Sequence, residues 1–163
     1  IEFTSGIDST YDIYQFEFVN IHAATDGAEF QFNLSTDGGS NYNITKTTTF
    51  FQAFHNEADS ATSLNYETGQ DLAQSTSDQV LITNMGTDND QSCSGTLQLF
   101  NPSSTTYVKH FISNINNYLN SDYSVEQFVA GYGNTTIAVN AIKFVMSSGN
   151  IDAGTIKMYG ISA

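Results

Sequence analysis

Large apolar side chains alternate with polar ones along much of this chain, and this period of two constrains the fold more than any other feature. In residues 11–21, Tyr14, Phe16 and Phe18 fall on one side of an extended chain and polar residues fall on the other. Such alternation is typical of a half-buried β-strand. The same pattern and its turn signals predict further strands at 29–34, 42–54, 64–66, 80–85, 95–100, 107–115, 124–130, 135–146 and 154–161.

These segments predict an all-β fold. No window shows a sustained helical stripe, and Gly, Asn, Asp and Ser clusters recur about every 8–12 residues, as in two packed antiparallel sheets. We expect one domain over residues 1–163, an antiparallel two-sheet β-sandwich of jelly-roll type. Residues 55–77 form a long polar excursion around a short strand. Because the chain begins at Ile1 and not at Met, we expect it to be the C-terminal part of a longer polypeptide.

Turns between neighbouring segments suggest which strands pair. Residues 11–21 and 29–34 are expected to run antiparallel across the turn at Asp26-Gly27. Hairpins are expected between 80–85 and 95–100, and between 135–146 and 154–161. Several glycines are expected at strand ends, where a positive φ is useful, namely Gly27, Gly38, Gly39, Gly95, Gly149, Gly154 and Gly160.

The charge of the chain excludes some partners. It has 17 acidic residues and 4 basic ones, which are Lys46, Lys109, Lys143 and Lys157, and a net charge of −13. Phosphate backbones need clustered cations and base reading favours Arg, so nucleic acid is not an expected partner. No stretch approaches the roughly 20 apolar residues of a membrane span, and no membrane partner is expected. Neutral or basic protein surfaces, divalent cations and uncharged sugars fit such a chain.

The sequence shows no convincing metal or cofactor site. Cys93 is the only cysteine, so no internal disulfide and no zinc spacing is available. Asp88-Asn89-Asp90-Gln91-Ser92 has the oxygen-rich alternation that calcium prefers, but it is followed by Cys93 where an EF-hand needs glycine. A surface calcium site and a plain solvated loop are the two interpretations of this loop. We expect neither a metal nor a cofactor.

Candidate catalytic residues are weak. His55-Asn56-Glu57, with Asp59 nearby, offers a general base and an orienting carboxylate, but no serine in a nucleophile elbow accompanies it. Glu17 and Glu29 could in principle flank a glycosidic bond, as many carboxylate pairs in an acidic β-protein could. His110 lies within a predicted strand and is expected to be structural. We expect no catalytic residue and no enzymatic activity.

Two terminal segments, with several turns between them, resemble a known family. They are residues 1–12 (IEFTSGIDSTYD) and 148–161 (SGNIDAGTIKMYGI), accompanied by turns at 24–28, 35–39, 94–96 and 101–102. Over its whole length the chain resembles jelly-roll structural proteins of tailed bacteriophages, particularly marine ones. Members tend to have further residues before the segment that starts here. The resemblance implies a virion component and transfers no catalytic residue.

Two functions are compatible with this resemblance. The first is a capsid decoration or cement protein on the outer surface of the virion, which binds the major capsid protein or other virion proteins as a homo-oligomer, with a trimer as one natural arrangement. The alternative is a tail- or fibre-associated adhesin that binds host glycans through loops 55–77 and 88–92. The chain has no Trp, the usual platform for a sugar ring, and this favours the first. A third interpretation, a glycan depolymerase domain, lacks an acid/base pair.

Overall fold

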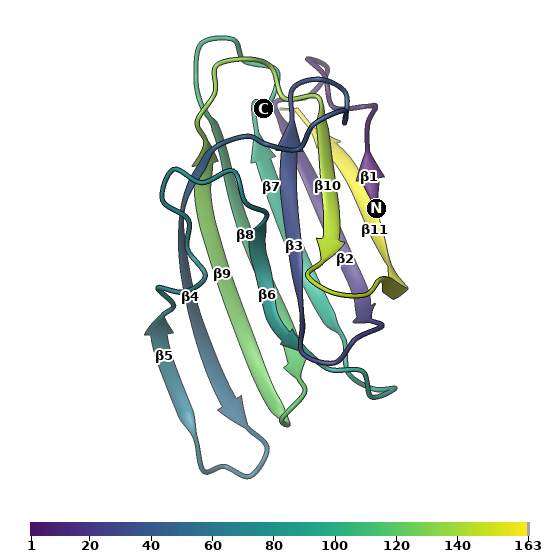
Figure 1. Ribbon diagram of the computed structural model, residues 1–163, viewed down its shortest axis with the longest axis vertical. Helices are drawn as coiled ribbons and strands as arrows, with labels where there is room; N and C mark the ends of the chain where they lie inside the picture. The colour runs from purple at the N-terminus through teal and green to yellow at the C-terminus, as the bar shows by residue number, and fades with distance from the viewer. Residues whose placement is uncertain (163) are drawn as a thin grey trace.

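The computed structural model describes residues 1–162 as an all-β, antiparallel protein, which confirms the predicted class (Figure 1). Its strands are β1 (Glu2–Phe3), β2 (Ile13–Ala23), β3 (Ala28–Ser35), β4 (Lys46–Asn56), β5 (Thr62–Tyr66), β6 (Gln79–Met85), β7 (Cys93–Phe100), β8 (Lys109–Leu119), β9 (Tyr123–Gly133), β10 (Ala141–Met146) and β11 (Ile151–Ile161). Each predicted strand overlaps an observed one, and β1 was not predicted. No helix long and apolar enough to cross a membrane occurs in the described residues.

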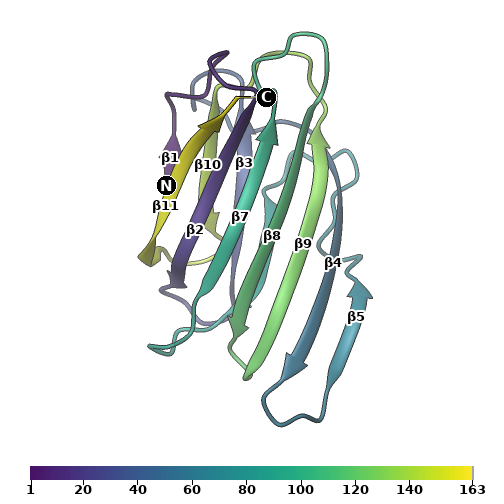
Figure 2. The same ribbon diagram turned by 180° about the vertical axis from the view of Figure 1, so that it is seen from behind.

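The strands lie in two layers. The larger layer follows the order β5-β4-β9-β8-β7-β2-β11, and the smaller follows β1-β10-β3-β6. Figures 1 and 2 show the smaller layer in front of the larger one and behind it, respectively. Hydrogen bonding joins the layers through β6 and β8, where the one register pair is Met85 opposite Leu119. We call the face of the larger layer that is turned away from the smaller layer the outer face.

Two predicted hairpins are wrong. β6 pairs with β3 and β8 and not with β7, while β10 pairs with β1 and β3 and not with β11. The predicted antiparallel neighbours β2 and β3 also lie in different layers. The physical reason is that these turns carry the chain from one layer to the other, so each strand finds its neighbour far away in sequence. Turn residues specify a change of direction but not the layer to which the chain returns.

An aromatic cluster forms the core between the layers. Phe144 of β10 meets Phe16 and Phe18 of β2, with ring centroids 5.3 Å and 5.1 Å apart. Phe32 of β3 meets Phe111 of β8 edge-on at 4.9 Å. Such contacts add to the burial of large apolar area. The alternation that predicted β2 therefore identified its buried side correctly, since Phe16 and Phe18 are fully buried.

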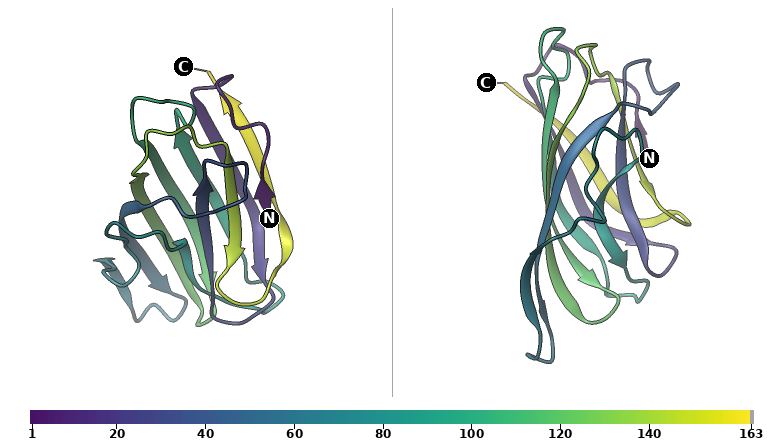
Figure 3. Two further views of the ribbon diagram at one scale, coloured as in Figure 1. Left: turned by 45° about the horizontal axis from the view of Figure 1, so that its top comes forward. Right: turned by 60° about the vertical axis from the view of Figure 1, so that its left-hand side comes forward.

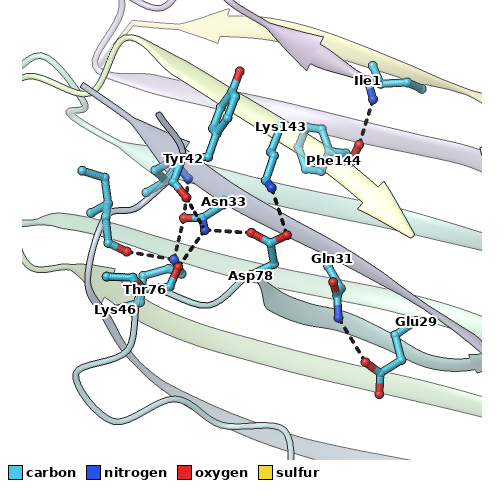
Figure 4. Close-up of polar contacts among 12 residues, drawn as sticks. Ile1, Glu29, Gln31, Asn33, Tyr42, Lys46, Thr76, Asp78, Lys143 and Phe144 are labelled. Carbon is cyan, nitrogen blue, oxygen red and sulfur yellow. Dashed lines mark hydrogen bonds and ion pairs between the residues drawn. The ribbon is translucent and has the colours of Figure 1, made fainter. Parts of the chain in front are cut away.

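Polar residues also lie in the interior, beside the loops that precede β4 and β6. Lys46 is buried and donates from Nζ to Asn33 Oδ1 (2.6 Å) and to the carbonyl of Ile44 (2.9 Å). Asn33 donates in turn to Asp78, which is 3.0 Å from Lys143 (Figure 4). Burial lowers the pKa of Lys46 to about 8. The network ties the loop before β4 to the loop before β6.

Gly95 lies inside β7 and not at a strand end, which corrects its predicted position. Its φ is not among the positive ones, so conformational freedom does not explain the glycine. A Cβ here would lie 2.3 Å from the carbonyl oxygen of Asn114 and 2.6 Å from the Cα of Ile115. The glycine lets β7 and β8 approach closely. Gly154 also lies within a strand, β11, but its φ is positive (105°), and Gly160 lies beside the end of β11 as predicted.

Candidate functional site

The outer face carries a row of aromatic and amide side chains that crosses four strands. Strand register places Asn114 of β8 opposite Phe128 of β9, Phe128 opposite Phe51 of β4, and Phe51 opposite Tyr66 of β5. These side chains lie on the outer face, because successive side chains of a strand point to opposite faces and Phe50, next to Phe51, is fully buried against the core. The rings of Phe51 and Phe128 stack 4.8 Å apart and nearly parallel, at 8°.

Further exposed apolar side chains lie on the same face beside this row. Leu64 is 72% exposed and Ile112 is 53% exposed, although both lie in hydrogen-bonded strands. We call this surface the outer patch; its members are Phe51, Leu64, Tyr66, Ile112, Phe128 and Tyr132. A contiguous exposed apolar surface on a folded domain commonly marks a contact with a partner.

A hollow of about 440 Å³ opens within the outer face. Ala130 lies in it, and its small side chain leaves space between Ile112 and the ring of Tyr132. His110 forms another wall, with its ring 6.1 Å from that of Tyr132. His110, which was expected to be structural, lies in a strand as predicted and is exposed on this face. The hollow could accept an apolar side chain of a partner.

Charge is scarce on this face although the chain is strongly acidic. In β4, β5, β8 and β9, which are fully described, Glu126 is the one Asp, Glu or Lys side chain on the outer face. Lys46 and Lys109 of β4 and β8 point to the opposite, buried side. A nearly uncharged aromatic surface, on a chain of net charge −13, has the composition that is typical of the centre of a protein interface.

Three of the residues considered for catalysis, His55, Asn56 and Glu57, line a hollow of about 220 Å³. Its other walls come from β8 and β9, through Asn116, Asn117, Tyr118 and Ser124. His55 Nε2 lies 3.1 Å from Asp59 Oδ1, but the Asp59 side chain is 91% exposed on a turn. Glu17 lies on the outer face of the larger layer beside Lys157, whereas Glu29 lies in β3 of the smaller layer. Because Phe30 next to Glu29 faces the core, the two carboxylates point away from opposite faces of the molecule.

The loop at residues 88–92, for which a calcium site and a plain solvated loop were the two interpretations, lines a polar hollow of about 590 Å³. Asn89, Asp90 and Ser92 form one side, and His22 and Asp152 form another. His22 Nδ1 lies 2.7 Å from Asp152 Oδ1, and Nε2 lies 3.3 Å from the carbonyl of Asp88. The hydrogen bond to Asp152 raises the pKa of His22. Within residues 1–162 no three His, Cys, Asp or Glu side chains are placed to share a metal ion.

The outer patch was not predicted from the sequence. The pattern of β8 alternates, but both of its sides carry apolar residues, with Phe111 buried and Ile112 exposed. In β9, Val129 is buried while its neighbour Phe128 joins the patch. Large apolar residues on both sides of adjacent strands are the signal that could have revealed a second apolar face.

We compared the chain with protein-family models, with curated proteins and with solved structures, and none matches it.

Proposed function

We propose that this chain is a non-enzymatic structural protein of a virion, a capsid decoration or cement protein that attaches to the shell through its outer patch. The observation that carries the proposal is the exposed, nearly uncharged aromatic surface across β8, β9, β4 and β5. The virion as location comes from the resemblance of residues 1–12 and 148–161. For the fold we propose a jelly-roll β-sandwich, which is supported by the two layers and the crossings between them.

The chemistry of the patch favours a protein over other occupants. Protein interfaces are enriched in Tyr, Phe and other apolar residues at their centre and depleted of carboxylates, as here. The acidic remainder of the chain would repel an acidic partner and leaves a neutral or basic shell surface as the complement. About 800 Å² per partner is the usual size of a stable contact. A rigid sheet face can present such an area without an ordering cost.

The patch is tested by removing its two most exposed aliphatic side chains. The double variant Ile112→Ser/Leu64→Ser should reduce binding to purified capsid shells at least about tenfold, because centrally buried anchors contribute about 1 kcal/mol or more each. Binding is measured by co-sedimentation with the shells.

The matched control is Ile137→Ser/Tyr107→Ser, which removes two exposed apolar side chains outside the patch. This control should bind as the unmodified chain does. Equal binding by both double variants would contradict the proposal.

A second function, glycan binding by a tail or fibre adhesin, is favoured by the polar hollow at residues 88–92. Its carboxylates and amides, on Asp90, Asp152, Asn20 and Asn89, are groups that hydrogen-bond sugar hydroxyls. Binding of host surface glycans that is lost in Asp90→Asn and kept in the outer-patch variant would establish this function in place of the first.

A further inference from the structure

The larger layer ends in a long strand whose second edge is unpaired. β11 pairs with β2 alone and lies at the border of its layer (Figures 2 and 3). Register shifts interrupt its first part between Ile151 and Thr155, but Thr155–Ile161 is regular. No backbone hydrogen bond outside the β2 ladder involves β11 in the described part of the chain. An exposed edge of this length is a template for strand addition.

The hydrogen bonds between β2 and β7 identify which backbone groups of β11 are free. The N–H of Asn101 donates to the carbonyl of Asp12 (2.6 Å) just where β2 and β7 begin to pair. Along a strand, the backbone groups of successive residues point alternately to the two neighbouring strands. The backbone N–H and C=O groups of Tyr14, Phe16 and Phe18 therefore bond to β7, and those of the residues between them bond to β11. Their partners in β11 are Thr155, Lys157, Tyr159 and Ile161. Ile156, Met158 and Gly160 therefore direct their N–H and C=O groups away from the layer.

Exposed apolar side chains gather beside this edge. On the outer face, Tyr159 of β11 is 43% exposed and Val19 of β2, opposite Thr155, is 42% exposed. Ile161 is exposed at the end of the same strand. Lys157 is the one charged residue in the regular segment, and it faces Glu17 of β2. The edge of β11 thus has free backbone groups, exposed apolar side chains beside them and little charge.

We propose that a second copy of this chain adds its β11 antiparallel to this edge, about a two-fold axis at Met158. Met158 is the midpoint of the regular segment Thr155–Ile161, so this register uses all of it. Met158 then exchanges both backbone bonds with Met158 of the second copy, and Ile156 does so with Gly160 of the second copy. Lys157 comes to lie opposite Tyr159 of the second copy, and no two like charges are opposed.

The two-fold axis of an antiparallel pair stands perpendicular to the sheet, so the outer faces of both copies lie on the same side. Each dimer would present two outer patches in one direction, and bivalent attachment exceeds single attachment by about 10²–10⁴ in affinity. The expected homo-oligomer is then a dimer and not a trimer. The inference rests on β11 alone and stands or falls independently of what the outer patch binds.

Two substitutions at one exposed residue test the register. Tyr159→Lys places a lysine opposite Lys157 of the second copy at two symmetric points, and should weaken the dimer about tenfold. Tyr159→Glu places a carboxylate opposite the same lysine and should leave the dimer as strong or stronger. If net charge alone decided the strength of the dimer, Tyr159→Lys would strengthen it and Tyr159→Glu would weaken it. The reason is that the lysine reduces the repulsion between two acidic copies and the glutamate increases it.

The measurement is sedimentation velocity of the full chain over a range of concentrations, with Tyr107→Lys as a control for added charge away from the edge. A concentration-dependent dimer, weakened by Tyr159→Lys and not by Tyr159→Glu or the control, establishes the proposal. A monomer at every concentration overturns it, as does a dimer in which Tyr159→Glu is the weaker variant. The variant Ile112→Ser/Leu64→Ser should dimerise normally, which separates this result from failure of the proposed attachment.

Discussion

At the scale of single residues, the most informative side chains are the buried lysines. Lys109 donates from Nζ to the carbonyls of Ser104 (2.6 Å), Tyr107 (2.6 Å) and Thr135 (3.4 Å). Its ammonium therefore joins the loop before β8 to the loop after β9. Burial lowers the pKa of Lys109, which shows the desolvation cost that these carbonyls offset. The ammonium group of Lys109 is thus held by a cluster of backbone carbonyl oxygens, here called the carbonyl cage.

Replacing this lysine should destabilise the fold. Lys109→Met keeps the apolar stem but leaves carbonyl oxygens without a donor, and we expect a loss of about 2–3 kcal/mol in the free energy of unfolding. Lys157→Met removes the same charge from an exposed position and should change the value by less than about 0.5 kcal/mol. Urea unfolding measures both. Equal effects would contradict the role assigned to the carbonyl cage.

His22 should make stability depend on pH. Both of its ring nitrogens face acceptors, Asp152 and the carbonyl of Asp88, and Asp90 lines the same hollow. Because the folded pKa is raised, the stabilisation is fully present below about pH 6.5 and is lost as the pH rises through the folded pKa. The pair is partly exposed, so the effect should stay below about 1 kcal/mol.

The measurement for His22 is urea unfolding of the unmodified chain and of His22→Gln between pH 5.5 and 8.5. The difference in unfolding free energy between them should shrink as the pH rises. A difference that is constant, or that grows with pH, would show that protonated His22 does not stabilise the fold.

Residue patterns gave the strands but not always their buried side. In β2, Phe16 and Phe18 marked the core because polar residues separate them. In β8 the apolar residues occur on both sides, and the interior receives Lys109 while Ile112 stays exposed. The burial of Lys109 also depends on the carbonyl of Thr135, which is 26 residues away in sequence, and no local pattern contains that information. The outer patch was missed because apolar residues on both sides of β8 and β9 do not show by themselves which side is buried.

At the scale of strands, pairing depends on contacts far apart in sequence. β11 lies beside β2, and β10 lies beside β3, although the turn between β10 and β11 is short enough for a hairpin. The aromatic contacts of Phe144 with Phe16 and Phe18 explain the preference, because they need β10 in the layer opposite β2. Periodicity predicted where strands run, and long-range packing decided which of them pair.

Close approach of β7 and β8 gives a prediction at this scale. Gly95→Ala should destabilise the protein by about 1–3 kcal/mol, because the new Cβ meets the backbone of Asn114 and Ile115, which cannot move without disturbing the pairing. Thr96→Ala, on the adjacent outer position, should cost less than about 1 kcal/mol. Thermal unfolding measures the stability of both variants. If Gly95→Ala left the stability unchanged, β7 and β8 would be able to move apart without destabilising the fold.

At the scale of the whole molecule, one layer provides two separate surfaces. The outer patch lies over β8, β9, β4 and β5, whereas the free edge of β11 lies at the other end of the strand order. Both are poor in charge, although the chain carries a net charge of −13. The acidic surface elsewhere opposes non-specific association, so the two proposed contacts lie where charge repulsion is weakest.

The same charge predicts how salt acts on the dimer. Two copies repel each other, and the screening length falls from about 10 Å at 0.1 M salt to about 3 Å at 1 M. The dimer dissociation constant, measured by sedimentation, should therefore decrease as salt increases. A dimer that weakens with salt would instead be held by ion pairs, which the proposed register does not contain.

Imaging of intact particles at side-chain detail would show whether the outer patch attaches this chain to a capsid shell, as we propose. We expect symmetric copies on the shell, with β8, β9, β4 and β5 against the capsid protein and with weaker shells in particles that lack the chain. Density confined to the tail or its fibres, or copies on the shell whose outer patch faces solvent, would contradict it.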